Sequence, residues 1–79
     1  MSKQKLKPGQ VWESKSGKQR FVSFISSDDR GRVRLDSVSI GMSAYIWWCA
    51  SAAGGAPRRC YMGTWQDWSD GATLVGGEA

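Results

Sequence analysis

Apolar and polar side chains alternate over several short segments of the chain, and glycine, proline, serine and aspartate separate these segments. Period-two segments bounded by turn residues are typical of half-buried β-strands. The segments with this pattern are residues 10–15, 18–25, 32–38, 45–49, 58–62 and 72–75. The pattern predicts an all-β fold, either a small barrel or a bent antiparallel meander.

The first hairpin is predicted to turn at Ser16-Gly17. A two-residue turn there places Trp12 opposite Phe21 and Glu13 opposite Arg20, two cross-strand pairs that each stabilise a sheet. In the next strand, residues 32–38, alternation predicts three outward and two inward side chains. The outward ones are Arg32, Arg34 and Asp36, and the inward ones are Val33 and Leu35. In the turn between the strands 18–25 and 32–38, the side chains of Asp28 and Asp29 are expected to hydrogen-bond to the backbone. Gly31 is expected to adopt a positive φ.

The second hairpin is the most conspicuous part of the sequence because it is rich in aromatic residues. A turn at Gly54-Gly55 fixes its register. The predicted pairs are Cys49 with Cys60, Trp48 with Tyr61, and Trp47 with Met62. One face then holds Tyr45, Trp47, Cys49, Cys60 and Met62, and the other holds Ile46, Trp48, Ala50, Arg59 and Tyr61. Both faces are apolar, so one is expected to be core and the other is either covered or an interaction surface.

The predicted opposition of Cys49 and Cys60 leaves two alternatives open. Directly opposed residues lie within the Cα separation that a disulfide tolerates. An intracellular setting favours packed, reduced thiols instead. Metal binding is not expected, because the chain has no histidine and two thiols do not complete a zinc site.

One helical segment is predicted between the aromatic hairpin and the last strand. Thr64 is a candidate N-cap for a short helix over residues 65–70, which Gly71 would end. Trp65 and Trp68, three residues apart, share one face of it. Residues 1–7 are expected to be a flexible basic arm, residues 8–75 a single domain, and residues 76–79 a disordered tail.

Composition limits the function classes. A chain of 79 residues holds one small domain, and its five Trp, two Tyr and two Phe residues supply large apolar area for a core. The sequence shows no apolar segment of membrane-spanning or signal-peptide type, which predicts a cytoplasmic protein. Without histidine, a Walker-type loop or a nucleophile beside a partner base, we expect no enzyme activity and no cofactor.

Basic residues provide the main functional hypothesis. All but two of the 11 Lys and Arg residues lie within residues 1–34. Lysine and arginine on a β face neutralise phosphates while rings stack on bases, so this distribution predicts nucleic-acid binding. The candidate residues are Lys15, Lys18, Arg30, Arg32, Arg34, Arg58 and Arg59. The alternative is a solvated face that keeps a small protein in solution.

A protein partner is the second hypothesis, since Trp, Tyr and Arg are over-represented at interface hot spots. The candidate interaction residues are Trp47, Trp48, Tyr61 and Arg59. The expected partner is thus nucleic acid or a protein of a host complex. The protein would be a monomer or homodimer, with no membrane partner and no small-molecule ligand.

The turn and strand pattern resembles the SH3-like barrels. The resemblance rests on Lys7-Pro8-Gly9-Gln10-Val11-Trp12, the Phe21–Ile25 strand, the Gly31 turn, Arg32–Leu35 and a helical turn before Leu74-Val75. This group includes the KOW-type ribosomal and transcription modules and short barrel proteins of phages and mobile elements. The resemblance implies a binding module, such as an inhibitor of a host defence complex. The aromatic hairpin departs from the compact KOW pattern.

Overall fold

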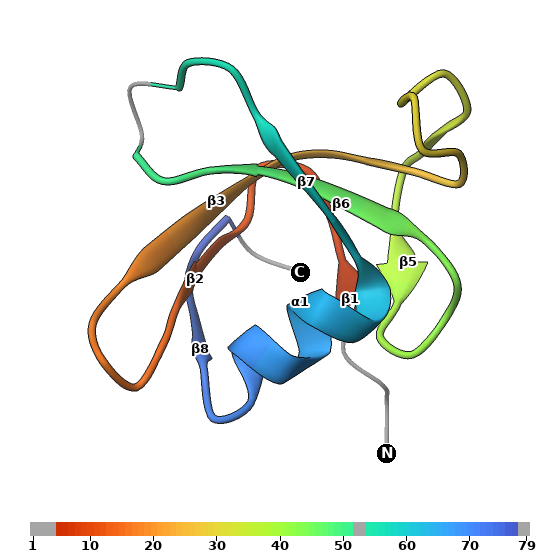
Figure 1. Ribbon diagram of the computed structural model, residues 1–79. Helices are drawn as coiled ribbons and strands as arrows, with labels where there is room; N and C mark the ends of the chain where they lie inside the picture. Colours follow the sequence, from red (N-terminus) through yellow and green to blue (C-terminus); the bar gives the residue numbers. More distant parts are fainter. Residues whose placement is uncertain (1–4, 52–53, 78–79) are drawn as a thin grey trace.

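The structure is a computed structural model, and it describes residues 5–51 and 54–77. Its strands are β1 Lys5–Leu6, β2 Val11–Glu13, β3 Gln19–Ser26, β4 Arg34–Leu35, β5 Val38–Ser39, β6 Tyr45–Cys49, β7 Arg58–Tyr61 and β8 Thr73–Gly76, and its helix is α1 Met62–Ser69. The larger sheet has the order β7-β6-β3-β2-β8, with β4 beside β3, and β1 pairs with β5 (Figure 1). The all-β prediction with one short helix is confirmed. The sheet is bent but, among the described residues, not closed into a barrel.

Strand β3 organises the larger sheet because it is long and pairs along both edges. It pairs with β2 and β4 along one edge and with β6 along the other. Its register with β6 shifts between Val22 and Phe24, where Val22 lies opposite Trp48 and Phe24 opposite Trp47. An extra residue at such a bulge, here Ser23, reverses the alternation of faces. Val22 therefore faces the core while Phe24 faces outward.

The first hairpin differs from the prediction by one residue. Val11 lies opposite Phe21, and Trp12 lies opposite Arg20. The reason is a three-residue connection: the Gly17 N–H donates to the Ser14 carbonyl, and Gly17 has a φ of +88°. A type I turn followed by a left-handed glycine adds one residue to the connection. A shift of one residue exchanges faces, so Arg20 lies on the same inner face as Trp12.

The second hairpin also has a different register. Ile46 lies opposite Cys60, Trp47 opposite Arg59 and Trp48 opposite Arg58. The predicted tight turn at Gly54-Gly55 is wrong, since the pairing of β6 with β7 ends at Trp48 and Arg58, and the connection between Cys49 and Arg58 is longer than a two-residue turn. Small residues, glycine and Pro57 in this connection are poor strand formers.

The observed register has a clear packing advantage. It packs the half-buried Cys60 against the core opposite Ile46, whereas the predicted register would turn the charged Arg59 toward the core. Arg59 and Tyr61 consequently share the outer face with Tyr45 and Trp47. The predicted opposition of Cys49 and Cys60 is wrong as well, and both thiols are free.

The predicted strand over residues 32–38 is replaced by two shorter ones, β4 and β5. Leu35 packs against the core as predicted, but the Val33 side chain is 55% exposed. Arg30 and Arg32 belong to the preceding turn, so Arg32 and Arg34 do not share the outward face of one strand as predicted. The Asp28 carboxylate accepts hydrogen bonds from the backbone N–H groups of residues 32 and 33, which holds this segment in a turn.

Helix α1 begins three residues earlier than predicted and follows β7 without a connection. Tyr61, not Thr64, occupies the N-cap position, and it makes no side-chain capping bond. The first helical N–H, that of Met62, donates instead to the Ala44 carbonyl at 3.0 Å. The helix ends before Gly71, as predicted, because that glycine adopts a φ of +77°.

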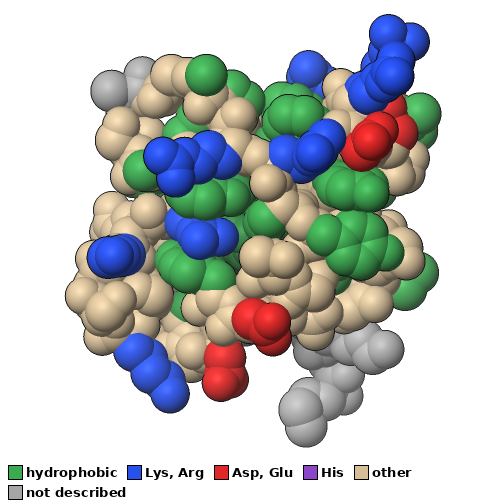
Figure 2. Space-filling model, in the orientation of Figure 1, with side chains coloured by type: hydrophobic (Ala, Val, Ile, Leu, Met, Phe, Trp, Pro, Cys, Tyr) green, Lys and Arg blue, Asp and Glu red, His purple; other side chains and the backbone are tan. Residues whose placement is uncertain are grey.

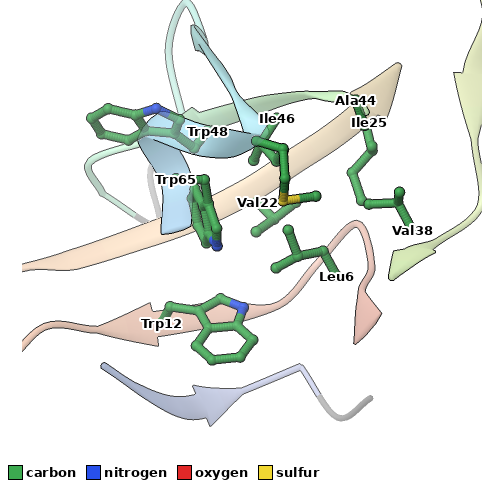
Figure 3. Close-up of a cluster of buried hydrophobic side chains, with 10 residues drawn as sticks. Leu6, Trp12, Val22, Ile25, Val38, Ala44, Ile46, Trp48 and Trp65 are labelled. Atoms are coloured by element: carbon green, nitrogen blue, oxygen red, sulfur yellow. The ribbon is translucent and has the colours of Figure 1, made fainter. Parts of the chain in front are cut away.

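The core lies between the inner face of the sheet and α1. Trp65 points from α1 into the cluster, with Trp48 on one side of it and Trp12 on the other (Figure 3). Leu6 of β1 is fully buried there, so the flexible arm predicted for residues 1–7 does not extend to Lys5 and Leu6. The predicted tail begins too early, since Gly76 belongs to β8. Residues 1–4, 78 and 79 lie outside the described residues.

Candidate functional site

An aromatic surface runs across the outer face of β3, β6 and β7. We define the outer strip as Phe24, Arg34, Tyr45, Trp47, Arg59 and Tyr61. The rings of Phe24 and Trp47 stack with centroids 5.0 Å apart and an interplanar angle of 15°. The Arg34 guanidinium lies 3.9 Å from the Phe24 ring centroid. The strip thus combines half-exposed rings with exposed guanidinium groups.

Arg59 joins the strip to the loop between β3 and β4. Its guanidinium lies 5.7 Å from the Tyr45 ring centroid and 5.9 Å from that of Trp47. One of its N–H groups donates to the Asp29 carbonyl of the loop. Tyr61 packs edge-on against Tyr45 at 5.1 Å. Arg59 thereby holds the loop, which carries Arg30 and Arg32, against the rings.

Buried polar contacts fix the orientation of Trp47. Its Nε1 donates to the Ser26 hydroxyl at 2.9 Å, and that hydroxyl donates to the Asp28 carbonyl at 2.6 Å. The hydroxyl is therefore both donor and acceptor, which satisfies a buried serine. The indole is set by β3 and by the adjoining loop, so the strip is a preorganised surface.

The Asp28 carboxylate gives this loop a dependence on pH. Two backbone hydrogen bonds hold the pKa of the Asp28 carboxyl below its usual value of 3.8. The N–H of Val33 has the larger effect, and the N–H of Arg32 adds to it. A carboxyl group whose pKa is lower when folded stabilises the fold above its unfolded pKa, and this contribution is lost as pH falls through the folded pKa. Asp28→Asn is therefore expected to lower the melting temperature at pH 7.

The difference between Asp28→Asn and the unmodified chain should shrink as pH falls from about 5 toward 2, where the native carboxyl is protonated too. Thermal melts at a series of pH values measure it. Asp29→Asn is the matched control, because the Asp29 carboxylate accepts no hydrogen bond within the described residues. Equal effects of the two variants at every pH would contradict the assignment.

A second candidate site lies on the inner face, where the sheet opens beside α1. We define the Arg20 pocket as the cavity of about 450 Å³ lined by Lys18, Gln19, Arg20, Trp48, Ala50, Arg58 and Trp68. Three of these side chains are cationic and none is a carboxylate. On the side of the molecule that carries β7 and α1, Figure 2 shows Lys and Arg side chains set among hydrophobic ones. The pocket is an electropositive hollow with aromatic walls.

Arg20 lies against two indole rings of this pocket. Its guanidinium carbon is 3.8 Å from the Trp48 ring centroid and 4.3 Å from that of Trp68. Its Nη1 is buried and has no acceptor among the described residues. Burial is the largest influence on Arg20, and it lowers the pKa of the guanidinium. The group remains charged at neutral pH because the ordinary pKa of arginine is so high. Arg20 is thus a fixed cation with unused donor capacity.

The Cys60 thiol lies beside this cation. Burial raises the pKa of Cys60, although the Arg20 guanidinium and the Trp48 indole N–H oppose the rise. A raised pKa keeps the thiol protonated at neutral pH, whereas a nucleophilic cysteine needs the thiolate. The arrangement favours a packing role for Cys60.

The predicted site residues divide between the two faces. Arg34, Arg59, Trp47 and Tyr61 meet in the outer strip, with Arg30 and Arg32 in the adjoining loop. Lys18, Arg58 and Trp48 belong to the Arg20 pocket. Lys15 joins neither group, because its side chain lies against Gly71 after the helix. The single basic face predicted over residues 15–34 is therefore two separate cationic clusters.

Sequence reasoning missed Arg20, Trp68, Phe24 and Tyr45 as site residues. Arg20 was predicted opposite Glu13 because of the one-residue error in the first hairpin. The segment Ser14-Lys15-Ser16-Gly17-Lys18 carried the correct signal, because a glycine in third place of a three-residue connection is typical of a bulged turn. Phe24 was missed because no sequence signal located the bulge at Ser23.

Comparisons with known proteins return no match: no family model, no curated protein and no solved structure is similar to this chain. Within residues 5–51 and 54–77, no helix has the length and apolarity needed to cross a membrane. The same residues contain no group of three or more acidic, cysteine or histidine side chains that would hold a metal ion.

Proposed function

We propose that this protein is a non-catalytic module that binds single-stranded nucleic acid across the outer strip. One observation carries the proposal: the Arg34 and Arg59 guanidinium groups lie over half-exposed rings on an open antiparallel sheet. Arginines near a ring face are free to bind phosphates while the rings stack on bases. Arg30 and Arg32, in the loop held by Arg59, extend the positive surface.

A single strand fits this surface better than a duplex. The rings of Phe24, Trp47 and Tyr61 lie along a sheet face, and a base must leave its own stack before it packs on such rings. A duplex offers its phosphates but keeps its bases stacked. The outer strip would thus use electrostatic attraction for affinity and ring stacking for the preference for single strands.

Fluorescence polarisation with a labelled single-stranded oligonucleotide tests the proposal. Affinity should fall steeply as salt rises, because bound phosphates release counterions. Arg34→Gln and Arg59→Gln should each reduce the slope of log affinity against log salt by about 0.7. Trp47→Ala should weaken binding by roughly 5- to 100-fold, the effect of losing one stacked base.

Lys15→Gln is the matched control for these variants, since Lys15 is basic but lies away from the outer strip. It should leave both the affinity and the salt slope close to those of the unmodified protein. Absence of binding at low salt would refute the proposal. So would an equal loss of affinity in Lys15→Gln and Arg59→Gln.

A protein partner is the second candidate for the same strip. The observation that favours it is the grouping of Trp47, Arg59 and Tyr61, with the Tyr61 side chain 45% exposed, since these three residue types dominate interface hot spots. Such a partner would be a protein of a host complex, in keeping with the phage and mobile-element barrels that the sequence resembles. In that case Trp47→Ala should abolish capture of the partner, while Arg32→Ala, in the adjoining loop, leaves it intact.

A further inference from the structure

We propose that the Arg20 pocket is a separate binding site for the 5′-phosphate and base of a nucleotide, either free or at the end of a strand. The site does not depend on the function of the outer strip, because the two lie on opposite faces of the sheet. Trp47 and Trp48, successive residues of β6, point to those opposite faces. Arg58 and Arg59 of β7 divide in the same way.

The charge of the pocket selects an anion. Lys18, Arg20 and Arg58 line it, and no carboxylate among its lining residues neutralises them. At neutral pH, where the Cys60 thiol is protonated, the charged group that acts on Arg20 is Arg58, and it disfavours the charge of Arg20. The guanidinium carbons of Arg20 and Arg58 lie 3.8 and 5.7 Å from the Trp48 ring centroid, so the two cations share one ring and repel each other. A phosphate monoester, with nearly two negative charges at neutral pH, relieves that repulsion.

The geometry of Arg20 selects an oxyanion with more than one oxygen. A guanidinium is planar and its N–H donors point outward within that plane, so rings that pack on its faces leave its donors free. Trp48 and Trp68 pack on it at 3.8 and 4.3 Å, and its Nη1 is buried, but the Arg20 side chain still lines the pocket, where its other donors make no hydrogen bond to the described residues. Arg20 is therefore positioned before a ligand arrives, and it has donors for a bidentate contact with phosphate.

The walls and the size of the pocket select an aromatic ligand. The half-buried Trp68 and the ring of Trp48 line the pocket beside the cations and supply apolar surface, and the small side chain of Ala50 completes the lining. A volume of about 450 Å³ is within the range of small-ligand sites, which starts near 300 Å³. This matches one nucleotide. An inorganic anion would leave the indole surface unused.

A purely structural role for Arg20, in which it covers the end of the core, makes a different prediction. In that role the cation–π contacts with Trp48 and Trp68 stabilise the fold, and the pocket binds no ligand. Binding measurements separate the two possibilities. Isothermal titration calorimetry with AMP, adenosine and inorganic phosphate, each added to the whole protein, is the direct test.

AMP is expected to bind at least tenfold more tightly than either adenosine or inorganic phosphate, since only AMP supplies both the charge and the ring. Indole fluorescence from Trp68 should change with AMP. If adenosine or phosphate binds as well as AMP, or if AMP does not bind, the proposal is wrong. Oligonucleotides with and without a 5′-phosphate distinguish the sources: preference for the phosphorylated strand over AMP identifies a strand end, and the reverse identifies a free nucleotide.

Arg58→Gln and Arg59→Gln form a matched pair for this test, because both residues are exposed on β7 and face opposite sides. Arg58→Gln should weaken AMP binding by roughly tenfold or more, the effect of losing a charged hydrogen-bond donor, and Arg59→Gln should not change it. Equal effects would overturn the proposal. Arg20→Lys keeps the charge but loses the planar donors, and it should reduce AMP affinity by a similar factor while circular dichroism reports an unchanged fold.

Discussion

Replacement of Trp65 by alanine is expected to remove most of the stability of this protein. The Trp65 side chain is fully buried between Trp12 and the rings at the Arg20 pocket, and it packs edge-on against Trp12 at 6.5 Å. Truncation of a buried tryptophan costs about 3 to 5 kcal/mol. A domain of 79 residues has a total of roughly 4 to 12 kcal/mol. Urea denaturation should show a much lower midpoint, or a chain that is unfolded without denaturant.

Trp68→Ala is the control for that prediction, since Trp68 lies on the same face of α1 but is only half-buried. It should cost roughly 1 to 2 kcal/mol, in keeping with partial burial of one ring. It should also weaken AMP binding, because it removes a wall of the Arg20 pocket. Equal losses of stability in Trp65→Ala and Trp68→Ala would contradict the assignment of Trp65 to the centre of the core.

The sequence predicted which segments become strands but not which way their side chains face. Alternation located β2, β3, β6, β7 and β8, because a half-buried strand leaves a period-two pattern. The face to which a side chain points depends on the number of residues in the connection before its strand. An error of one residue moves every side chain of that strand to the opposite face. Arg20 illustrates the consequence: it was expected opposite Glu13, and it lies instead opposite Trp12, beside the tryptophan rings of the inner face.

The same error explains the cysteines. Cys60 was paired with Cys49 because Gly54-Gly55 looked like a tight turn, and glycine pairs are common in such turns. Both glycines do adopt positive φ, but within a longer connection that the ladder does not reach. What decides the register is the cost of burying Arg59, a tertiary effect that no local pattern reports. Leu6 was missed for a related reason, since its partner strand β5 is far away in sequence.

The division of basic residues into two clusters follows from these registers. Arg58 and Arg59 were expected to contribute to one surface, yet successive residues of a strand point to opposite faces. An open, bent sheet does not enclose its core, so another element must cover that core if both faces of the sheet are to carry binding sites. Here α1 covers the centre of the inner face, and Arg20 lies at the end that α1 leaves open. The fold thus creates both candidate sites.

Gly31→Ala is expected to destabilise the fold and to disturb the outer strip together. Gly31 is buried with a φ of +73°, and a Cβ atom there would lie 2.9 Å from Phe24 and 3.3 Å from Trp47. Left-handed backbone costs a residue with a Cβ about 1 to 2 kcal/mol, and the contact with Phe24 adds to it. We expect a total of roughly 2 to 4 kcal/mol, measured by chemical denaturation.

Gly17→Ala separates the two causes. Gly17 has a φ of +88°, but a Cβ atom there would meet nothing within 4 Å, so that variant should show only the backbone cost. The excess in Gly31→Ala then measures the contact with the Phe24 and Trp47 rings. Because Phe24 must move to make room, oligonucleotide affinity should fall in Gly31→Ala and stay unchanged in Gly17→Ala. Equal stability losses would mean that the loop yields instead of the ring, and the strip would then be less rigid than its contacts with Ser26 and Arg59 imply.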